Sequence, residues 1–293
     1  MSWFLNYLLV PALVYGCTYA LVATGFNVLE RSTRVLNFAH GYLIMWAPMA
    51  TLVLSAAWGV PPIIGLLGGV LVAIILGLLV EVIAIRPFVG KADVLPWILS
   101  TLGASLVLGQ LALLPFKGEA RAFPYALSLS PGHFGIVQIS PQQMLLFGVT
   151  VLVALAIYTI NGRTRLGKML TAVAEDFDGS RVLGISPTRM AQAAMIGSAV
   201  VAAATGMLIA PFLLVSPDLG FNLTFTGFVA AALGGLGSLR GGFLGGIAVG
   251  FVIQLTAIYL GSVWTNTALF AVLLLVLLVR PWGLLGQAPA RQV

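Results

Sequence analysis

The chain has 293 residues, of which 60% are hydrophobic and only 8% are charged, and its mean hydropathy is +1.09. Soluble domains carry roughly 25% charged residues, so this composition excludes an ordinary water-soluble globular protein. The formal net charge of +6 would suggest a nucleic-acid partner in a soluble protein. Here the basic residues flank apolar runs, which indicates contact with a lipid bilayer and no nucleic-acid partner.

Nine apolar runs approach the 20 or so residues that a helix needs to cross a bilayer. In chain order they are 7–29, 36–57, 62–85, 94–115, 143–161, 189–213, 222–239, 241–261 and 265–280. The seventh run is short and rich in glycine, so whether 222–239 crosses fully decides between about eight and nine spans. The sequence therefore predicts an all-α, polytopic integral membrane protein with a single transmembrane domain over residues 1–293.

The basic residues also predict the orientation of the spans. With nine crossings and an external amino terminus, Lys117 and Arg121 fall outside, and the other 12 of the 14 lysines and arginines fall inside. Cytoplasmic loops are enriched in Lys and Arg, so we expect a multi-pass inner-membrane protein with its carboxyl terminus in the cytoplasm. If 222–239 only dipped into the membrane, Arg280 and Arg291 would lie outside, which this count disfavours.

Two connecting segments are longer than the others, residues 116–142 on the predicted external side and residues 162–188 on the predicted cytoplasmic side. Neither can bury a core of its own, since independent folding takes at least about 40–60 residues. Residues 170–176 predict a short helix, and Ser186-Pro187 predicts the start of the next span. Such a helix is either a docking point for a cytoplasmic partner or a solvated connector.

Several kinds of chemistry find no support in the residues. Residues 162–169 approach a phosphate-binding loop, but Met169 stands where the magnesium-binding hydroxyl belongs, so we expect no ATP site in this chain. The single cysteine, Cys17, excludes a disulfide within the chain and is expected to be a buried apolar side chain. His40 and His133 fall on opposite sides of the membrane, so we expect neither a metal site nor a cofactor.

Glycines recur at helical spacing. The sets are Gly237, Gly241 and Gly245, then Gly242, Gly246 and Gly250, and the pair Gly65 and Gly69. A four-residue glycine repeat lets two membrane helices approach closely, and this packing interpretation is favoured. The alternative is that Gly234, Gly235 and Gly237 break a helix and expose backbone groups along a translocation path.

Polar residues near span ends give further hypotheses. His40, with Asn37, is a candidate for the path or its gating, because ionisable groups in membranes are often functional. A hydrogen-bonded packing role is the favoured alternative, since His40 is expected within one or two turns of the cytoplasmic face. Glu30 is expected to pair with Arg31, and Glu81 with Arg86 one turn further on.

Four segments together resemble one family. Ala172-Val173-Ala174-Glu175-Asp176, followed by Leu183-Gly184-Ile185, resembles the coupling loop of permeases of branched-chain amino acid ABC transporters. Asn37-Phe38-Ala39-His40-Gly41, Leu233-Gly234-Gly235-Leu236-Gly237-Ser238 and Arg280-Pro281-Trp282-Gly283-Leu284-Leu285-Gly286 resemble further signatures of that family, in its order. Phe177-Asp178-Gly179-Ser180 departs from the family's alanine-rich run, so the coupling helix is expected to break or end early there.

The resemblance implies the transmembrane domain of an ATP-binding cassette importer that translocates amino acids, with branched-chain ones expected, across the inner membrane. It is a transport subunit and not an enzyme. The implied partners are a second, homologous permease subunit, two cytoplasmic ATPase subunits, and a periplasmic or extracellular substrate-binding protein. The implied coupling residues are Ala174, Glu175, Asp176, Arg181, Leu183, Gly184 and Ile185, and the candidates for the path and its gating are Asn37, His40, Gly41, Gly234, Gly235 and Gly237.

One alternative stays open, a self-sufficient secondary transporter or channel for small polar solutes. It would need a coupling group inside the membrane, yet few charged residues lie deep in any predicted span.

Overall fold

The computed structural model describes residues 3–89, 94–124, 130–134 and 136–286; Lys91 and Arg291, both used for the orientation, lie outside these ranges. The α-helices and strands are α1 (Val10–Thr33), α2 (His40–Trp58), α3 (Pro62–Val80), α4 (Val94–Phe116), β1 (Gly132–Phe134), β2 (Val137–Ile139), α5 (Pro141–Arg163), α6 (Arg165–Glu175), α7 (Phe177–Val182), α8 (Pro187–Ile209), α9 (Leu219–Gly234), α10 (Leu239–Tyr259) and α11 (Thr265–Val279). Short π-helical segments precede α1 (Phe4–Leu9) and follow α3 (Glu81–Ile85), and 3₁₀ turns occupy Arg86–Phe88 and Ser262–Trp264.

Each of the nine predicted apolar runs coincides with a long helix. Within the described residues, seven helical segments are long and apolar enough to cross a membrane, and α9 is a shorter apolar helix of 16 residues. The remaining long helix, α2, has 19 residues and contains Pro48. These findings confirm the all-α, polytopic membrane fold.

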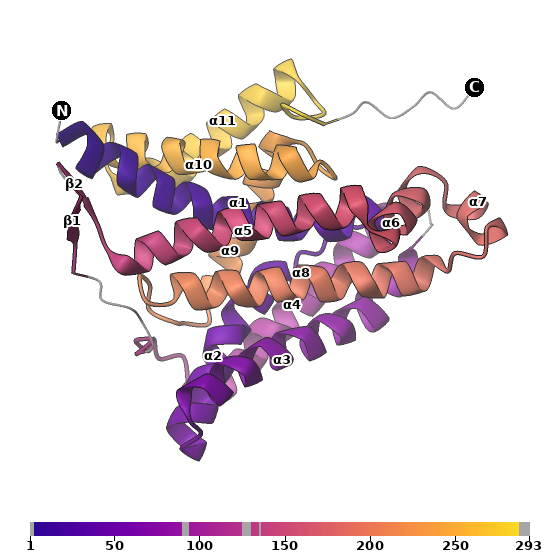
Figure 1. Cartoon of the computed structure of the whole chain (residues 1–293), viewed down its shortest axis with the longest axis horizontal. Helices are drawn as coiled ribbons and strands as arrows, with labels where there is room; N and C mark the ends of the chain where they lie inside the picture. Colours follow the sequence, from indigo (N-terminus) through magenta and orange to yellow (C-terminus); the bar gives the residue numbers. More distant parts are fainter. Residues whose placement is uncertain (1–2, 90–93, 125–129, 135, 287–293) are drawn as a thin grey trace.

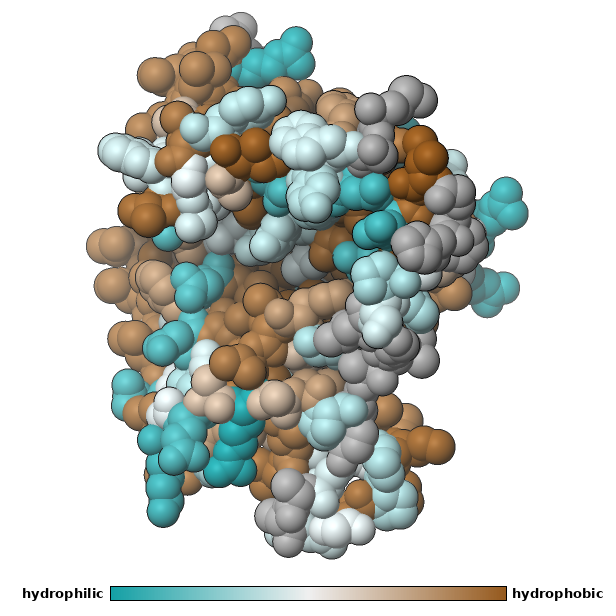
Figure 2. All heavy atoms as spheres, turned by 90° about the vertical axis from the view of Figure 1, so that its left-hand side faces the viewer, coloured by the Kyte–Doolittle hydropathy of each residue, from teal (hydrophilic) through white to brown (hydrophobic). Residues whose placement is uncertain are grey.

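The bundle has two distinct ends (Figure 1). One end, called here the α6 end, carries α6 and α7, and the opposite end, called the hairpin end, carries β1 and β2. At the hairpin end Arg121 and Val215 also exchange two backbone hydrogen bonds of 3.0 and 2.9 Å. Figure 2 views this end, where hydrophilic residues are scattered over a face that also shows hydrophobic residues.

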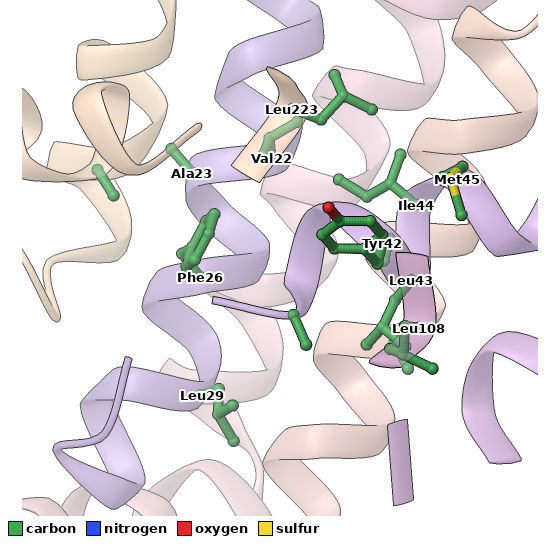
Figure 3. Close-up of a cluster of buried hydrophobic side chains, with 14 of the residues drawn as sticks. Val22, Ala23, Phe26, Leu29, Tyr42, Leu43, Ile44, Met45, Leu108 and Leu223 are labelled. Atoms are coloured by element: carbon green, nitrogen blue, oxygen red, sulfur yellow. The ribbon is translucent and has the colours of Figure 1, made fainter. Parts of the chain in front are cut away.

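Helix α1 lies at the centre of the bundle. It packs against α5, α8, α9 and α10, and 67% of its most apolar stretch is buried, against 11% for α5 and for α11. Its side chains Val22, Phe26 and Leu29 share a core cluster with Leu43 of α2 and Leu223 of α9 (Figure 3). Since α3, α4, α5 and α11 expose most of their apolar residues, they form the outside of the bundle.

Glycines bring α10 into backbone contact with α1. A methyl group added to Gly246 would overlap the backbone of Ala20, and one added to Gly250 would overlap the backbone of Gly16. A second set of α10 glycines, Gly241 and Gly245, faces α9 in the same way, since Gly245 lies against the Ala230 carbonyl. The packing interpretation is therefore confirmed for the glycines within α10 and α3, whereas Gly237 lies in the turn before α10 with a φ of 73°.

We expect Gly246→Leu to prevent stable assembly of the bundle. The added side chain meets backbone and not a movable side-chain end, so α1 and α10 must separate, at a cost of about 3 kcal/mol, the upper end of the usual range for overpacking. Size-exclusion chromatography of a fluorescent fusion in mild detergent should show loss of the monodisperse peak. Gly103→Leu in α4 is the matched control, because nothing lies within 4 Å of its added carbon; equal profiles for the two variants would contradict the expectation.

The second span starts later than predicted. Residues 35–39 are not helical, Arg34 adopts a left-handed conformation (φ 55°), and α2 begins only at His40. The His40 ring lies against Gly25, nine residues or about 14 Å along α1 from Arg34. His40 therefore lies deeper than the expected one or two turns, because a non-helical segment brings the chain into the bundle before the helix starts.

Two other local expectations are confirmed. Glu81 is fully buried and accepts two hydrogen bonds from Arg86, at 2.8 and 3.2 Å. The coupling segment is broken into two short helices at Asp176, whose backbone is extended and whose carboxylate accepts a hydrogen bond from the Gly179 amide.

Candidate functional site

An open cavity of about 910 Å³ lies at the α6 end of the bundle. Its walls come from the carboxyl end of α1, the second half of α5, α6, the α9–α10 turn and the start of α10, and from Trp282 and Leu285 beyond α11. Three predicted site residues from separate parts of the chain line it, namely Ala174, Glu175 and Gly237. The fold therefore places part of the predicted coupling loop beside part of the predicted path.

Two arginines of α1 hold α6 beside this cavity. Arg31 donates a hydrogen bond to the Thr171 hydroxyl at 3.3 Å, and Arg34 donates one to the Ala174 carbonyl at 2.8 Å. Arg34 also ends α1 and begins the non-helical segment that leads to α2. A displacement of α6 would thus act directly on the start of that segment.

The expected ion pair between Glu30 and Arg31 is wrong. Among the described residues, Arg31 forms no ion pair and donates instead to Thr171. The Glu30 carboxylate lies against Gly237 in the α9–α10 turn. Adjacent residues point to different faces of a helix, which explains why neighbours in sequence have different partners here.

Helix α7 and the residues after it form an exposed tip at the α6 end (Figure 1). Ile185 donates its backbone N–H to Ser180 at 3.0 Å and Gly184 donates to Arg181 at 3.0 Å, while Gly184 has a φ of 78°. This is the Schellman pattern that ends a helix, and it needs a left-handed residue at the position of Gly184. Val182 and Leu183 remain 88% and 77% exposed at this tip.

The predicted residues at the start of α2 are buried. Asn37, His40 and Gly41 are almost inaccessible, and the Asn37 side chain accepts a hydrogen bond from the Ala39 amide at 3.0 Å. The His40 Nδ1 atom is 3.1 Å from the Ser198 hydroxyl, which donates to the Gly25 carbonyl at 2.9 Å. These contacts join α2 to α8 and α1.

The amino ends of α2 and α9 meet inside the bundle. The Thr224 hydroxyl is within 3.3 Å of the Phe38 carbonyl, and Gly41 leaves no room for a side chain beside Gly220. Helix α2 therefore starts where other helices surround it, as discontinuous helices of transporters do, whereas the first turn of α9 is buried on one side and exposed at Phe221 on the other.

The α9–α10 turn is held by a residue that we did not select from the sequence. Asn27 of α1 is fully buried; its amide group donates to the carbonyls of Ser238 at 2.9 Å and Gly235 at 3.3 Å, and its oxygen accepts from the Gly237 amide at 3.1 Å. Gly235 and Gly237 have φ values of 114° and 73°, which favour glycine. An amide side chain in the middle of an apolar run was the available signal, because a buried polar group needs partners.

Two of the family-like signatures, residues 233–238 and 280–286, lie side by side. Leu284 and Leu285 donate backbone hydrogen bonds to the carbonyls of Leu233 and Gly234, at 2.8 and 2.9 Å. Segments about 50 residues apart in the sequence thus form one structural unit with Asn27, beside the cavity.

The predicted site residues therefore occupy three places. Ala174, Glu175 and Gly237 line the cavity, with Gly234 and Gly235 buried behind it. Arg181, Leu183, Gly184 and Ile185 lie in the tip, after Asp176. Asn37, His40 and Gly41 lie deeper, at the start of α2. Within the described residues, no group of three or more His, Cys, Asp or Glu side chains could hold a metal ion.

Comparison with known proteins gives a consistent result over nearly the whole chain. The family described as "Branched-chain amino acid transport system / permease component" matches residues 8–279. The high-affinity branched-chain amino acid transport system permease protein BraD of Pseudomonas aeruginosa is 32% identical, covering 97% of both chains. The corresponding protein LivH of Escherichia coli is 30% identical over 95% of this chain and 94% of its own length.

A solved structure supports the fold. PsaBC from Streptococcus pneumoniae, determined in complex with Fab, superposes with a TM-score of 0.50 and covers 92% of this chain and 91% of its own. At 13% identity this likeness concerns the arrangement of helices alone.

Proposed function

The chain belongs to the family of permease components of branched-chain amino acid transport systems, which makes it a permease subunit of an ABC importer and not an enzyme; on this basis we propose that it translocates branched-chain amino acids and is driven through α6 and α7. The observation that carries the mechanism is the exposed apolar tip at Val182 and Leu183. Large apolar side chains on a protruding polar segment are typical of a surface that another protein covers.

Permeases of this family work with ATPase and substrate-binding components. We propose the finer assembly of two permease subunits, two ATPases beneath the α6 ends, and a binding protein at the hairpin ends. The hydrogen bonds from Arg31 and Arg34 to α6 support this arrangement, because they join the proposed ATPase contact to α1 and to the segment before α2.

We further propose that the α6 end faces the cytoplasm, so that the amino terminus lies outside the cell and the carboxyl terminus lies in the cytoplasm. Ten described Lys and Arg residues support this, since they follow or precede spans at the α6 end: Arg31, Arg34, Arg86, Arg163, Arg165, Lys168, Arg181, Arg189, Arg240 and Arg280. Lys117 and Arg121 lie at the other ends of the spans. This asymmetry is the one expected for the inner face of a membrane.

The translocation path is proposed to pass the joined amino ends of α2 and α9. Helix amino ends carry partial positive charge, which favours a carboxylate without a charged side chain. In the single chain Asn37, His40 and Gly41 are covered, so their part in gating requires that α2 and α9 move relative to each other. Gly234, Gly235 and Gly237 would permit the movement of α9 at its other end.

Purification and uptake together test this function. We expect the tagged chain to bring down an ATPase encoded beside it, and its deletion to abolish ATP-dependent uptake of radiolabelled leucine. Uptake that persists after deletion, or that follows an ion gradient after ATP depletion, would exclude the proposal and favour a secondary transporter.

A further inference from the structure

The cavity at the α6 end extends much deeper than the ends of the helices around it. Thr24 of α1 and Ala154 of α5 line it, although Thr24 lies ten residues before Arg34 and Ala154 nine residues before Arg163. At 1.5 Å per residue, the cavity reaches about 15 Å into the bundle from the ends of α1 and α5. A docked cytoplasmic protein would cover the mouth but would not fill this depth.

The helices that form the cavity walls also carry exposed apolar side chains. On α5, Leu152 and Leu155 are 64% and 58% exposed, within one turn of the lining residues Ala154 and Ile157. On α10, Leu244 is 52% exposed beside the lining residue Phe243. The cavity therefore lies between two helix faces that expose apolar side chains, and apart from Thr24 its deep part is apolar.

The mouth of the cavity has the opposite character. Arg31, Arg34 and Arg240 line it, and in the part of the chain that the structure describes none of the three forms an ion pair with a carboxylate. The guanidinium of Arg240 lies 5.6 Å from the centre of the Tyr158 ring, which joins the α10 wall to the α5 wall. Glu30 and Glu175 also line the cavity, so the formal charge of its lining remains positive.

We infer that this cavity binds one anionic phospholipid from the leaflet at the α6 end. Its phosphate lies among the arginines at the mouth, and an acyl chain extends along Ala154, Ile157 and Phe243. A basic mouth over an apolar interior matches an amphipathic anion, and basic pockets between spans at the cytoplasmic side are suited to such headgroups. Because Arg31 and Arg34 also hold α6, the bound lipid stabilises the position of that helix.

Thermal unfolding of the purified full-length chain tests the inference with three probes. These are phosphatidylglycerol, phosphatidylcholine of the same acyl chains, and glycerol 3-phosphate. We expect phosphatidylglycerol alone to raise the unfolding temperature, by several degrees, and native mass spectrometry to show one retained molecule. Equal effects of the two lipids, or an equal effect of glycerol 3-phosphate, would overturn the proposal, since the site would then lack either headgroup or chain recognition.

Variants locate the binding. Arg240→Gln should weaken phosphatidylglycerol binding about fivefold, the usual contribution of one basic residue near an anionic surface, and Ala154→Trp should weaken it by filling the deep part. Arg163→Gln is the matched control, because Arg163 is exposed at the end of α5 and does not line the cavity. Unchanged binding in both test variants, or an equal loss in the control, would exclude this cavity as the site.

Discussion

Replacing Leu183 by arginine is expected to abolish ATP-driven uptake while leaving the permease folded in the membrane. Leu183 is 77% exposed at the tip formed by α7, so its substitution disturbs no packing within the chain. Central apolar anchors at protein interfaces contribute on the order of 2–4 kcal/mol, which corresponds to about 30-fold to 700-fold in affinity. A charged side chain placed at this contact with the partner should cost at least as much binding free energy.

The tip is suited to such an anchor because its backbone is fixed. The two hydrogen bonds that end α7 hold Leu183 in place before any partner arrives, so little ordering entropy is lost on binding. Co-purification of the ATPase and leucine uptake in the same strain measure the effect. Val263→Arg is the control, since Val263 is 90% exposed at the hairpin end. Full ATPase recovery with Leu183→Arg would refute the coupling role of the tip.

The second large effect is expected from Asn27→Leu, which should lower the stability of the permease by about 2–4 kcal/mol. The two side chains are similar in size, but leucine provides none of the three hydrogen bonds that Asn27 makes to the α9–α10 turn. Each buried backbone group left without a partner costs about 1–3 kcal/mol. Two of the three bonds are only partly buried, so water can replace some of the loss.

Unfolding followed by tryptophan fluorescence in detergent measures this loss. Asn161→Leu serves for comparison, because Asn161 in α5 donates one partly buried hydrogen bond, to the Ile157 carbonyl at 3.0 Å. We expect Asn161→Leu to cost less than about 1 kcal/mol. An unfolding midpoint for Asn27→Leu equal to that of the unchanged protein would show that the α9–α10 turn holds its shape without Asn27.

The arrangement of spans could be predicted because hydropathy measures directly what the bilayer requires. Lipid offers no partners for backbone groups, so each apolar run of sufficient length becomes a helix. All nine runs do so, including the glycine-rich run at α9. A break in the coupling segment was also predictable, although it falls at Asp176 and not at Gly179. Gly179 lies within α7, and Asp176 caps the start of that helix.

The positions of helix starts inside the bundle were not predictable in this way. Residues 36–39 belong to the second predicted span, yet they are not helical and leave α2 to start at His40. Hydropathy gives the same value to a non-helical segment and to a helix, so only the tertiary contacts with Gly25 and Ser198 reveal the depth. The deep start could not be recognised from neighbouring residues.

Candidate site residues could be proposed from the sequence where they belong to short motifs, whereas Asn27, which stands alone, was not selected. Leu183 and Gly184 lie within a recognisable loop, whereas Asn27 is a single amide in the first span. Its three partners lie in the α9–α10 turn, and nothing in the residues around Asn27 points to that turn. The incorrect Glu30–Arg31 pair has the same origin, since adjacency in sequence was taken as contact.

The central position of α1 has a consequence for the synthesis of the protein. Asn27 and its partner Gly235 are 208 residues apart, and the glycine face that packs on α1 belongs to α10. At 5–20 residues per second, the ribosome needs roughly 10–40 seconds to supply that partner after it has made α1. During this interval α1 presents an unpaired amide and an open groove to lipid or to the insertion machinery. Helix α1 is therefore made long before it reaches its final contacts.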